Sequence, residues 1–306
     1  MSDFKASMQS NQSVPLISVV TPSYNQAAYL ETTILSVLGQ CYPAIEYIIM
    51  DGGSSDGSVD IIRRYESQLA YWTSAKDGGQ AAAINSAFGR ANGEILCWIN
   101  SDDYLLPGAF WNVARLLRSE VTNPALIYGG CVLMREDVGI GKIVLPREHD
   151  IHRLAVSDYI IQPSAFWTRS LWEKTGVLDD KLSFAFDWDW FIRAAAHGQF
   201  INTPAMLSAY RFHQAHKSGS GGGQRRKEIV EVVRRHAPPE QAAAFAFAAR
   251  EWSAFERRVA IERGLRKARV PMPDKLAALL SPKLWTMPFG ISRKDVTNAE
   301  HMLSDP

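Results

Sequence analysis

Two pairs of acidic residues stand where the sequence could support chemistry. In the first pair, Asp102 and Asp103 follow an apolar run over residues 94–99. Adjacent carboxylates at such a point repel each other unless a cation joins them, and Mg2+ and Mn2+ prefer oxygen ligands. The pair therefore predicts a divalent metal site, with an ordinary polar turn over residues 100–103 as the alternative.

The second pair, Asp187 and Asp189, lies among aromatic residues at the head of a predicted helix over residues 188–196. Residues two apart do not share a helix face, so at most one of them is expected to point into a given site. A carboxylate surrounded by aromatic rings could have its pKa raised far enough to serve as a general base. Capping of the helix N-terminus is the alternative, and it is favoured when these residues are considered alone.

Residues 51–57 form an Asp-Gly-Gly-Ser-Ser-Asp-Gly segment that could approach a nucleotide. Asp51 could accept hydrogen bonds from a base or ribose, and Gly53 would let the backbone come close to a ligand. The alternative is a strand-to-helix turn with Ser55 or Asp56 as the N-cap. The segment has neither the Gly-Lys-Ser/Thr of a Walker loop nor the Gly-x-Gly-x-x-Gly of a dinucleotide site, which argues against both classes.

A basic segment precedes a glycine-rich loop over residues 218–224. His213 could ligate a metal, and Arg211 or Lys217 could neutralise a diphosphate; the alternative is the solvated end of a strand. Gln162 and Trp167 could line an acceptor pocket because sugars stack on aromatic faces, although tryptophan is more often buried.

The elements that would position these residues alternate along the chain. Strands are predicted over residues 16–20, 45–50, 70–73 and 94–99, with helical patterns between them. This order predicts right-handed crossovers and a mostly parallel sheet, in which ligands bind beyond the carboxyl ends of the strands. Residues up to about 112 therefore indicate a nucleotide-binding α/β unit, and further strands are predicted over residues 125–128 and 162–167.

The ends of the chain differ from this pattern. Residues 1–14 are polar and predict a flexible tail, whereas residues 225–268 are helical in pattern and several prolines follow between residues 271 and 288. The C-terminal helices carry many basic residues, among them Arg225, Arg226, Lys227, Arg234 and Arg235. A solvated helix surface is the ordinary interpretation of this basic face, and attraction to an anionic membrane or a dimer interface are the alternatives.

Composition excludes several classes. The 33 basic and 32 acidic side chains give a net charge of +1, unlike a nucleic-acid-binding protein. Three cysteines without paired spacing argue against a disulfide framework or a zinc knuckle. Neither an apolar run of about 20 residues nor a signal-peptide core is present, so a cytoplasmic protein is expected.

Taken in order, these segments resemble the family 2 glycosyltransferases, inverting enzymes with the GT-A fold. The resemblance covers roughly residues 15–218 and is carried by residues 17–26, 47–57, 76–85, 98–108, 187–193 and 210–218. It implies an α/β GT-A fold with a mostly parallel central sheet flanked by helices and a Rossmann-like nucleotide-binding half. It also implies a catalytic domain over residues 15–218, preceded by the tail and followed by a helical extension over residues 219–306.

The resemblance assigns site residues by position. Those implied to bind the nucleotide are Thr21, Pro22, Tyr24, Asn25, Asp51, Gly53, Asp77, Gln80, Asn85 and Ser101. Asp102, Asp103 and His213 are implied to hold the metal. Asp187 or Asp189 is implied to take the proton of the acceptor. The residues implied to contact the diphosphate or the acceptor are Gln162, Trp167, Arg211 and Lys217. The chain has Asn100 where the family has the first Asp of its metal motif, which would leave the ion on Asp102 and Asp103 with His213 as a further ligand.

The implied activity is metal-dependent transfer of a sugar from a nucleotide-diphosphate sugar, with uridine diphosphate as the commonest donor nucleotide, to a carbohydrate or lipid-linked acceptor. Surface polysaccharide or glycolipid assembly is the expected setting, with peripheral contact to the inner face of the membrane and oligomerisation through the C-terminal helices as further expectations. A sugar-phosphate nucleotidyltransferase is one alternative, but the segment over residues 21–26 lacks the basic residues of that class. A nucleotide-binding scaffold that has lost catalysis, with Asn100 as the lesion, is the other.

Overall fold

The computed structural model describes residues 14–118, 122–135, 139–213, 216–217, 221–267 and 291–304, which form two compact units. Unit 1 comprises the described residues up to Arg147, with Ile160–Leu178 and Ala196–Phe212. Unit 2 comprises Glu148–Tyr159, Asp179–Ala195 and the described residues from His213 onward. The predicted tail up to residue 13, the start of the glycine-rich loop at residues 218–220 and the prolines between 271 and 288 lie outside the described residues. The domain boundary at residue 218 stays a prediction.

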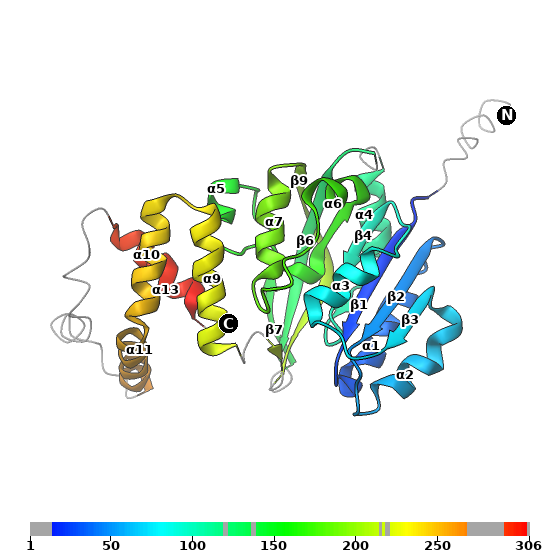
Figure 1. Ribbon diagram of the computed structural model, residues 1–306, viewed down its shortest axis with the longest axis horizontal. Coiled ribbons are helices and arrows are strands. Elements are labelled where there is room, and N and C mark those ends of the chain that lie inside the picture. Colours follow the sequence, from blue (N-terminus) through cyan, green and yellow to red (C-terminus); the bar gives the residue numbers. More distant parts are fainter. Residues whose placement is uncertain are drawn as a thin grey trace. The chain divides into compact units, whose positions relative to one another are not determined.

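Unit 1 is built on one β-sheet (Figure 1). Its described strands are β1 (Ile17–Ser23), β2 (Ile45–Asp51), β3 (Tyr71–Ser74), β4 (Ile95–Trp98), β5 (Tyr104–Leu105), β6 (Ala125–Arg135), β7 (Gly139–Val144), β8 (Ala165–Thr168) and β9 (Gln199–Phe212). The strand order is β3-β2-β1-β4-β8-β6-β9-β5, and β7 pairs with β6. Strands β3, β2, β1 and β4 run parallel, whereas β8 is antiparallel to both β4 and β6. The sheet is thus parallel over the N-terminal half, as predicted, and mixed beyond it.

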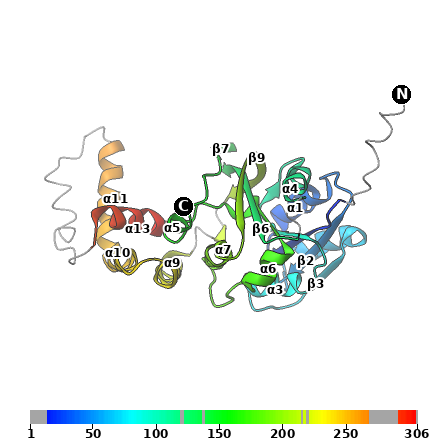
Figure 2. The ribbon, with the colours of Figure 1, turned by 90° about the horizontal axis from the view of Figure 1, so that it is seen from above.

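Helices cover both faces of this sheet. They are α1 (Ala27–Leu38), α2 (Ser58–Tyr65), α3 (Gln80–Phe88), α4 (Ala109–Leu117) and α6 (Arg169–Thr175). Figure 2 shows α1 and α4 on one face and α3 and α6 on the other. Alternation along β4 explains this, because Cys97 joins the apolar core that includes α1 and α4, whereas Trp98 contacts Phe88 and Trp167 across the opposite face. Both faces of the sheet are thus covered by helices.

Two predictions on local structure need correction. The predicted strand over residues 162–167 begins as a 3-10 turn, η3 (Gln162–Ser164), and becomes β8 only afterwards, because Pro163 has no N–H for a ladder. The N-cap of α2 is neither Ser55 nor Asp56 but Gly57. The Asp56 carboxylate still accepts the Ser58 N–H at 3.0 Å, and its other oxygen accepts the main-chain N–H of Ala27 at 2.8 Å. That bond joins the loops that follow β1 and β2.

Unit 2 is helical. Its described helices are α5 (Ile151–Leu154), α7 (Phe186–Ala195), α9 (Gly222–His236), α10 (Pro239–Arg250), α11 (Trp252–Lys267) and α13 (Arg293–Leu303). Ala244 and Phe247 of α10 pack with Val296 of α13 in a small apolar cluster. Across the part of the chain that the structure describes, no helix combines the length and apolarity needed to cross a membrane.

Part of the predicted basic face is used inside unit 2. The Arg234 and Arg235 side chains both donate to Glu231, at 2.7 and 3.0 Å, and the Arg226 guanidinium lies 4.8 Å from the centre of the Trp252 ring. The charge of Arg234 and Arg235 is therefore partly neutralised by Glu231, and the Arg226 guanidinium is in contact with an aromatic ring. Membrane contact and oligomerisation through these helices stay predictions.

Candidate active site

The loops that follow β1 and β2 are joined into one rim. The Asn25 main-chain N–H donates to the Ser54 hydroxyl at 2.8 Å, and the Ser55 N–H donates to the Asn25 side-chain oxygen at 2.9 Å. Asn25 itself has a φ of 52°, a left-handed conformation that asparagine tolerates better than most residues. The structure therefore brings the predicted segments 21–26 and 51–57 together.

Asp51 organises this rim from the buried end of β2. Its carboxylate accepts the N–H groups of Gly53 and Ser54 at 3.1 and 2.9 Å, and the hydroxyls of Ser54 and Ser74 at 2.5 and 2.6 Å. Gly53 has a φ of +84°, and a Cβ there would lie 3.3 Å from the main-chain nitrogen of Lys76, so glycine suits this turn. The predicted contact of Asp51 with a base would have to share a carboxylate that already fixes the loop.

An exposed aromatic ring and a carboxylate meet at the edge of the rim. The position of a Cβ on Gly52 would lie 3.3 Å from both Tyr24 Cδ2 and Asp77 Oδ2, so these two side chains approach the same point. Tyr24 is 63% exposed, unusual for a large aromatic residue, and Asp77 accepts the Gly79 N–H at 2.8 Å. A flat ring beside a fixed carboxylate can bind a planar heterocycle that carries hydrogen-bond donors.

Other residues assigned to the nucleotide lie deeper. Thr21 and Pro22 are buried within β1, and the Thr21 hydroxyl lies 3.0 Å from that of Tyr47. The Asn85 amide pairs with the main chain of Leu178 in both directions, at 2.9 Å each. Ser101 is also buried. The structure shows burial or protein partners for these four residues, and their contact with a nucleotide stays a prediction.

Asn100 is the centre of an amide network at the end of β4. Its side-chain oxygen accepts from Gln80 Nε2 at 2.8 Å, and its NH2 group donates to Asp103 Oδ2 at 3.2 Å and Gln162 Oε1 at 3.3 Å. An aspartate at position 100 could not donate these bonds and would add a negative charge beside Asp103. The departure from the family's usual Asp therefore has a structural explanation besides loss of activity.

The predicted metal ligands differ in environment. Asp103 is buried, and its Oδ1 accepts the Arg211 main-chain N–H at 3.0 Å. Burial, followed by the neighbouring charge of Asp102, raises the pKa of Asp103 well above its usual range. Asp102 is only partly buried, which makes it the better placed of the two carboxylates to meet a ligand.

No cluster of three or more His, Cys, Asp or Glu side chains suited to a metal ion is found among the described residues. His213, the third predicted ligand, is a buried residue of unit 2, where its carbonyl accepts a bond from His216 Nδ1 at 2.5 Å. Mg2+ and Mn2+ commonly use one or two carboxylates and take their other ligands from water and phosphate oxygens. Asp102 fits that kind of site, whereas the three predicted residues do not form a preformed cage.

Two residues assigned to the diphosphate or the acceptor are held inside unit 1. Trp167 is fully buried, with its ring centre 5.2 Å from that of Trp98. Its faces are therefore not available to a sugar, and the structure places it in the core rather than in an acceptor pocket. The Arg211 guanidinium lies 4.8 Å from the centre of the Tyr29 ring and 5.5 Å from that of Tyr104.

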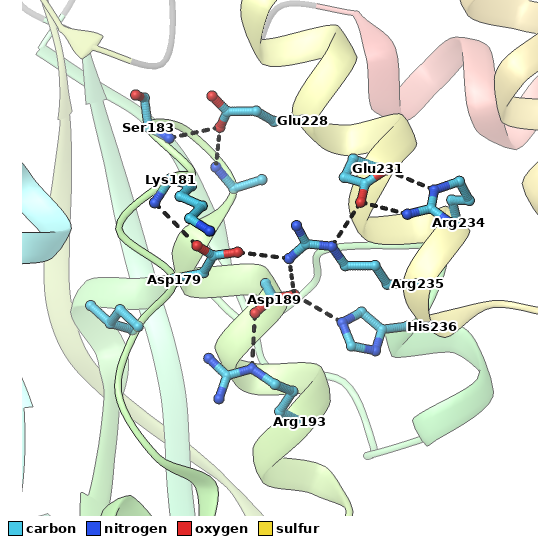
Figure 3. Close-up of polar contacts among 12 residues, drawn as sticks. Asp179, Lys181, Ser183, Asp189, Arg193, Glu228, Glu231, Arg234, Arg235 and His236 are labelled. Atoms are coloured by element: carbon cyan, nitrogen blue, oxygen red, sulfur yellow. Dashed lines mark hydrogen bonds and ion pairs between the residues drawn. The ribbon is translucent and has the colours of Figure 1, made fainter.

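Asp189, at the head of α7 in unit 2, is committed to ion pairs (Figure 3). It is 2% exposed and accepts from Arg193 Nε and His236 Nε2, each at 2.9 Å, with Arg235 Nη1 at 3.5 Å. Burial alone would raise the pKa of Asp189, but the hydrogen bonds and charges of these partners outweigh it and lower that pKa.

Asp187 lies in the opposite electrostatic situation. Burial raises its pKa, although the Trp188 N–H at 2.8 Å and the charges of Lys217 and Arg225 oppose the rise. Lys217 reaches solvent, but desolvation by the surrounding protein lowers its pKa, against the attraction of Asp187 and Glu228. A partly buried carboxylate with a raised pKa can take up a proton near neutral pH more readily than Asp189 can.

Sequence reasoning missed two acidic residues near Asp187. Asp158 reaches solvent, but the surrounding protein and then the charge of Asp187 raise its pKa well above the usual range. Glu228 is a buried acid within a basic helix, and its partners lie more than 40 residues earlier in the chain. The one signal in the sequence was an apolar setting for Glu228, next to Ile229 and Val232, which a solvated basic helix does not explain.

Comparison with known proteins identifies the family. The model described as glycosyl transferase family 2 matches residues 18–136. An uncharacterized glycosyltransferase of Mycobacterium tuberculosis is 31% identical over 186 residues, which are 60% of this chain and 70% of that protein. The putative teichuronic acid biosynthesis glycosyltransferase TuaG of Bacillus subtilis is 42% identical over 92 residues, or 29% of this chain and 36% of that protein.

Solved structures show the same fold at low identity. S. aureus TarS in complex with UDP-GlcNAc has a TM-score of 0.58 at 16% identity, covering 94% of this chain and 90% of that one. The mannosyltransferase PcManGT from Pyrobaculum calidifontis, in complex with GDP-Man and Mn2+, has a TM-score of 0.57 at 19% identity, covering 95% and 86%. The predicted family and fold class are thereby confirmed. The chain belongs to glycosyl transferase family 2 and has the GT-A fold.

Proposed function

We propose that this glycosyltransferase inverts the anomeric centre as it moves a sugar from a nucleotide-diphosphate sugar to an acceptor hydroxyl group. In such a displacement the hydroxyl loses its proton to a carboxylate, and its oxygen forms a bond to the anomeric carbon. The bond between that carbon and the diphosphate oxygen breaks, and the nucleoside diphosphate leaves with the electron pair. The observation that carries the proposal is the contrast between two acids at the head of α7: the pKa of Asp187 is raised, whereas that of Asp189 is lowered.

Asp187 is the proposed general base. A base that works near neutral pH needs a pKa close to the working pH, and burial raises that of Asp187 in this direction. Asp189 is the rival, but its carboxylate is paired with Arg193 and hydrogen-bonded to His236, and its pKa is lowered, so it is a poor proton acceptor. Asp189 is instead proposed to hold α7 in place.

The nucleotide is proposed to bind at the rim of unit 1. Tyr24 would stack on the base, and Asp77 would accept hydrogen bonds from it, while Asp51 and Asn25 keep the rim in shape. Exposure supports this division of roles, because Tyr24 offers its ring to solvent whereas Asp51 is bound on both carboxylate oxygens.

A divalent cation, Mn2+ or Mg2+, is proposed to be held by Asp102 together with donor phosphate oxygens. When bound, it would neutralise charge that develops on the leaving diphosphate. Asp103 supports Asp102 from the buried side, and its bonds to Asn100 and the Arg211 main chain fix the turn. Lys217 and Arg211 remain candidates for the diphosphate, and His213 for a further ligand.

Donor and acceptor classes are proposed by analogy. TarS binds UDP-GlcNAc and PcManGT binds GDP-Man, so a nucleotide-sugar donor is supported and uridine diphosphate is the first nucleotide to test. The name of TuaG supports a polysaccharide acceptor, consistent with surface-polysaccharide assembly. The proposal includes a cytoplasmic site of action, with peripheral membrane contact through the C-terminal helices.

The test is a two-step assay. The melting temperature is measured with uridine, guanosine and thymidine diphosphates, with and without Mn2+, because a ligand that binds only the folded state raises it. Release of the nucleoside diphosphate from the matching sugar donor is then measured in wild type, Asp187→Asn and Asp180→Asn, an exposed acid in the segment before α7 that serves as the matched control. We expect a metal-dependent shift with one nucleotide and loss of turnover only in Asp187→Asn; no shift with any nucleotide, or normal turnover in Asp187→Asn, would overturn the proposal.

A further inference from the structure

Glu228 places a buried carboxylate against the main chain that leads into α7. Its Oε2 atom accepts the N–H groups of Ser183, Phe184 and Ala185 at 2.9, 2.6 and 3.2 Å. Figure 3 shows the bond from Ser183. The Oε1 atom of Glu228 accepts from Gln224 Nε2 at 3.0 Å, one turn earlier on α9. A buried carboxylate is costly unless hydrogen bonds satisfy it, and four donors do so here.

These three N–H groups lie where α7 begins. The Asp189 N–H donates to the Ala185 carbonyl at 3.0 Å, so Ala185 is the first residue whose carbonyl enters the helix. Ala185 has no side-chain acceptor, and the sequence instead suggested Asp187 or Asp189 as capping acids. Glu228 provides negative charge at this helix end from another element, in addition to Asp187, whose carboxylate accepts the Trp188 N–H.

Two further contacts fix the same segment, one from Gly221 at the N-cap of α9 and one from Lys217. A Cβ on Gly221 would lie only 2.8 Å from Phe184 Cε1, so the backbone of α9 approaches that ring as closely as glycine allows. The Lys217 ammonium lies 5.6 Å from the ring centres of both Phe184 and Phe186, within the range of cation–π attraction. The segment is thus held by a carboxylate, a close backbone contact and a cation, all within unit 2.

We infer that Glu228 is a positioning residue for Asp187: by binding the N–H groups of residues 183–185, it fixes where the first turn of α7 holds the base. Glu228 acts through the main chain and does not touch the reacting atoms. The inference rests on the proposed role of Asp187 and goes beyond it, because it explains why an acid sits buried in a basic helix 41 positions later in the sequence.

Removal of the Glu228 carboxylate should reduce turnover without reducing donor binding. A displacement of about 1 Å in a catalytic group can lower a rate about 100-fold. Glu228→Ala removes the acceptor of all three N–H groups, so we expect kcat to fall about 100-fold while KM for the donor changes less than about threefold. Glu228→Gln keeps one side-chain oxygen that can accept these bonds, and it should restore about a tenth or more of wild-type kcat.

The experiment measures kcat and donor KM over pH, together with amide hydrogen exchange of residues 183–185, in wild type, Glu228→Ala, Glu228→Gln and Glu231→Gln. Glu231→Gln is the matched control, because it removes an acid of the same helix that accepts hydrogen bonds from Arg234 and Arg235 but none from the N–H groups of residues 183–185. The expected result is faster exchange and reduced kcat in Glu228→Ala, partial recovery of both in Glu228→Gln, and wild-type behaviour in Glu231→Gln.

Several results would overturn the inference. They are a kcat in Glu228→Ala within twofold of wild type, unchanged exchange at residues 183–185, or an increase in KM with no change in kcat. If Glu228→Ala does not fold, Glu228→Gln decides, since a positioning role requires a reduced kcat with faster exchange in a folded protein that still binds nucleoside diphosphate. Failure of the proposed function is distinguishable, because the wild type would then release no nucleoside diphosphate while the exchange measurement still reports on the Glu228 contacts.

Discussion

Substituting Asp187 and Asp189 of α7 by asparagine, one at a time, should separate effects on stability from effects on catalysis. Asp189→Asn removes a buried charge that accepts two charged hydrogen bonds at 2.9 Å. Each such bond contributes about 1.5–3 kcal/mol, but Arg193 and His236 keep 27% and 19% of their side chains exposed and can regain water. We therefore expect a loss of about 2–4 kcal/mol in the free energy of unfolding, below the sum of the two bonds.

Asp187→Asn should do the reverse. Because the folded-state pKa of Asp187 is raised, its ionisation costs stability as the pH rises above the unfolded value of about 3.9, and the amide removes that cost. The variant should be at least as stable as wild type at pH 7 and lose transfer. Asp189→Asn should keep measurable transfer wherever it is folded.

The pH dependence gives an independent check of Asp189. Its folded pKa is lowered, so its contribution is fully present above about pH 3.9 and is lost as the pH falls through the folded value. The difference between wild type and Asp189→Asn should therefore shrink in acid. Denaturant unfolding at pH 7 and pH 3, with Asp180→Asn as control, measures this. Equal stability of wild type and Asp189→Asn at pH 7, or loss of stability in Asp187→Asn, would refute the reasoning.

Three further changes test unit 1. Tyr24→Ala should weaken nucleoside diphosphate binding by about 1–3 kcal/mol, measured by calorimetry, with Tyr24→Phe unchanged; equal affinity in Tyr24→Ala would exclude stacking on this ring. Asn100→Asp should lower the free energy of unfolding by about 1–3 kcal/mol, because it cannot donate to Asp103 or Gln162; a stability within about 0.5 kcal/mol of wild type would contradict the network. Trp167→Phe should reduce stability but leave KM for the acceptor unchanged, and a large rise in that KM would return Trp167 to an acceptor pocket.

The sequence was most informative where periodicity and strand ends coincide. Four parallel strands, and the rim after the first two, follow from apolar runs that end in Asp, Asn, Ser or Gly. Strand β9 was predicted only as the alternative of a strand that ends before the glycine-rich loop, because Pro204 interrupts its pattern and its pairing with β6 is long-range. The role of Trp167 was also ambiguous, because the sequence pattern of a tryptophan in a core does not differ from that of one in a sugar-binding pocket.

The site was harder to predict, because environment decides the role of a carboxylate. Asp187 and Asp189 are chemically identical and two positions apart. Asp189 differs because it pairs with Arg193 on α7 and with Arg235 and His236 on α9, more than 40 positions later. Asp51 likewise could either face a ligand or fix a loop, and its four hydrogen bonds favour the second role. Sequence spacing cannot reveal such long-range pairs.

The most direct test of the central claim is the anomeric configuration of the transferred sugar, read by NMR from the first product formed with the donor that wild type accepts. A single displacement assisted by Asp187 predicts inversion relative to the donor, and no product from Asp187→Asn. Retention of configuration would require a different mechanism and would contradict the assignment of Asp187 as the base.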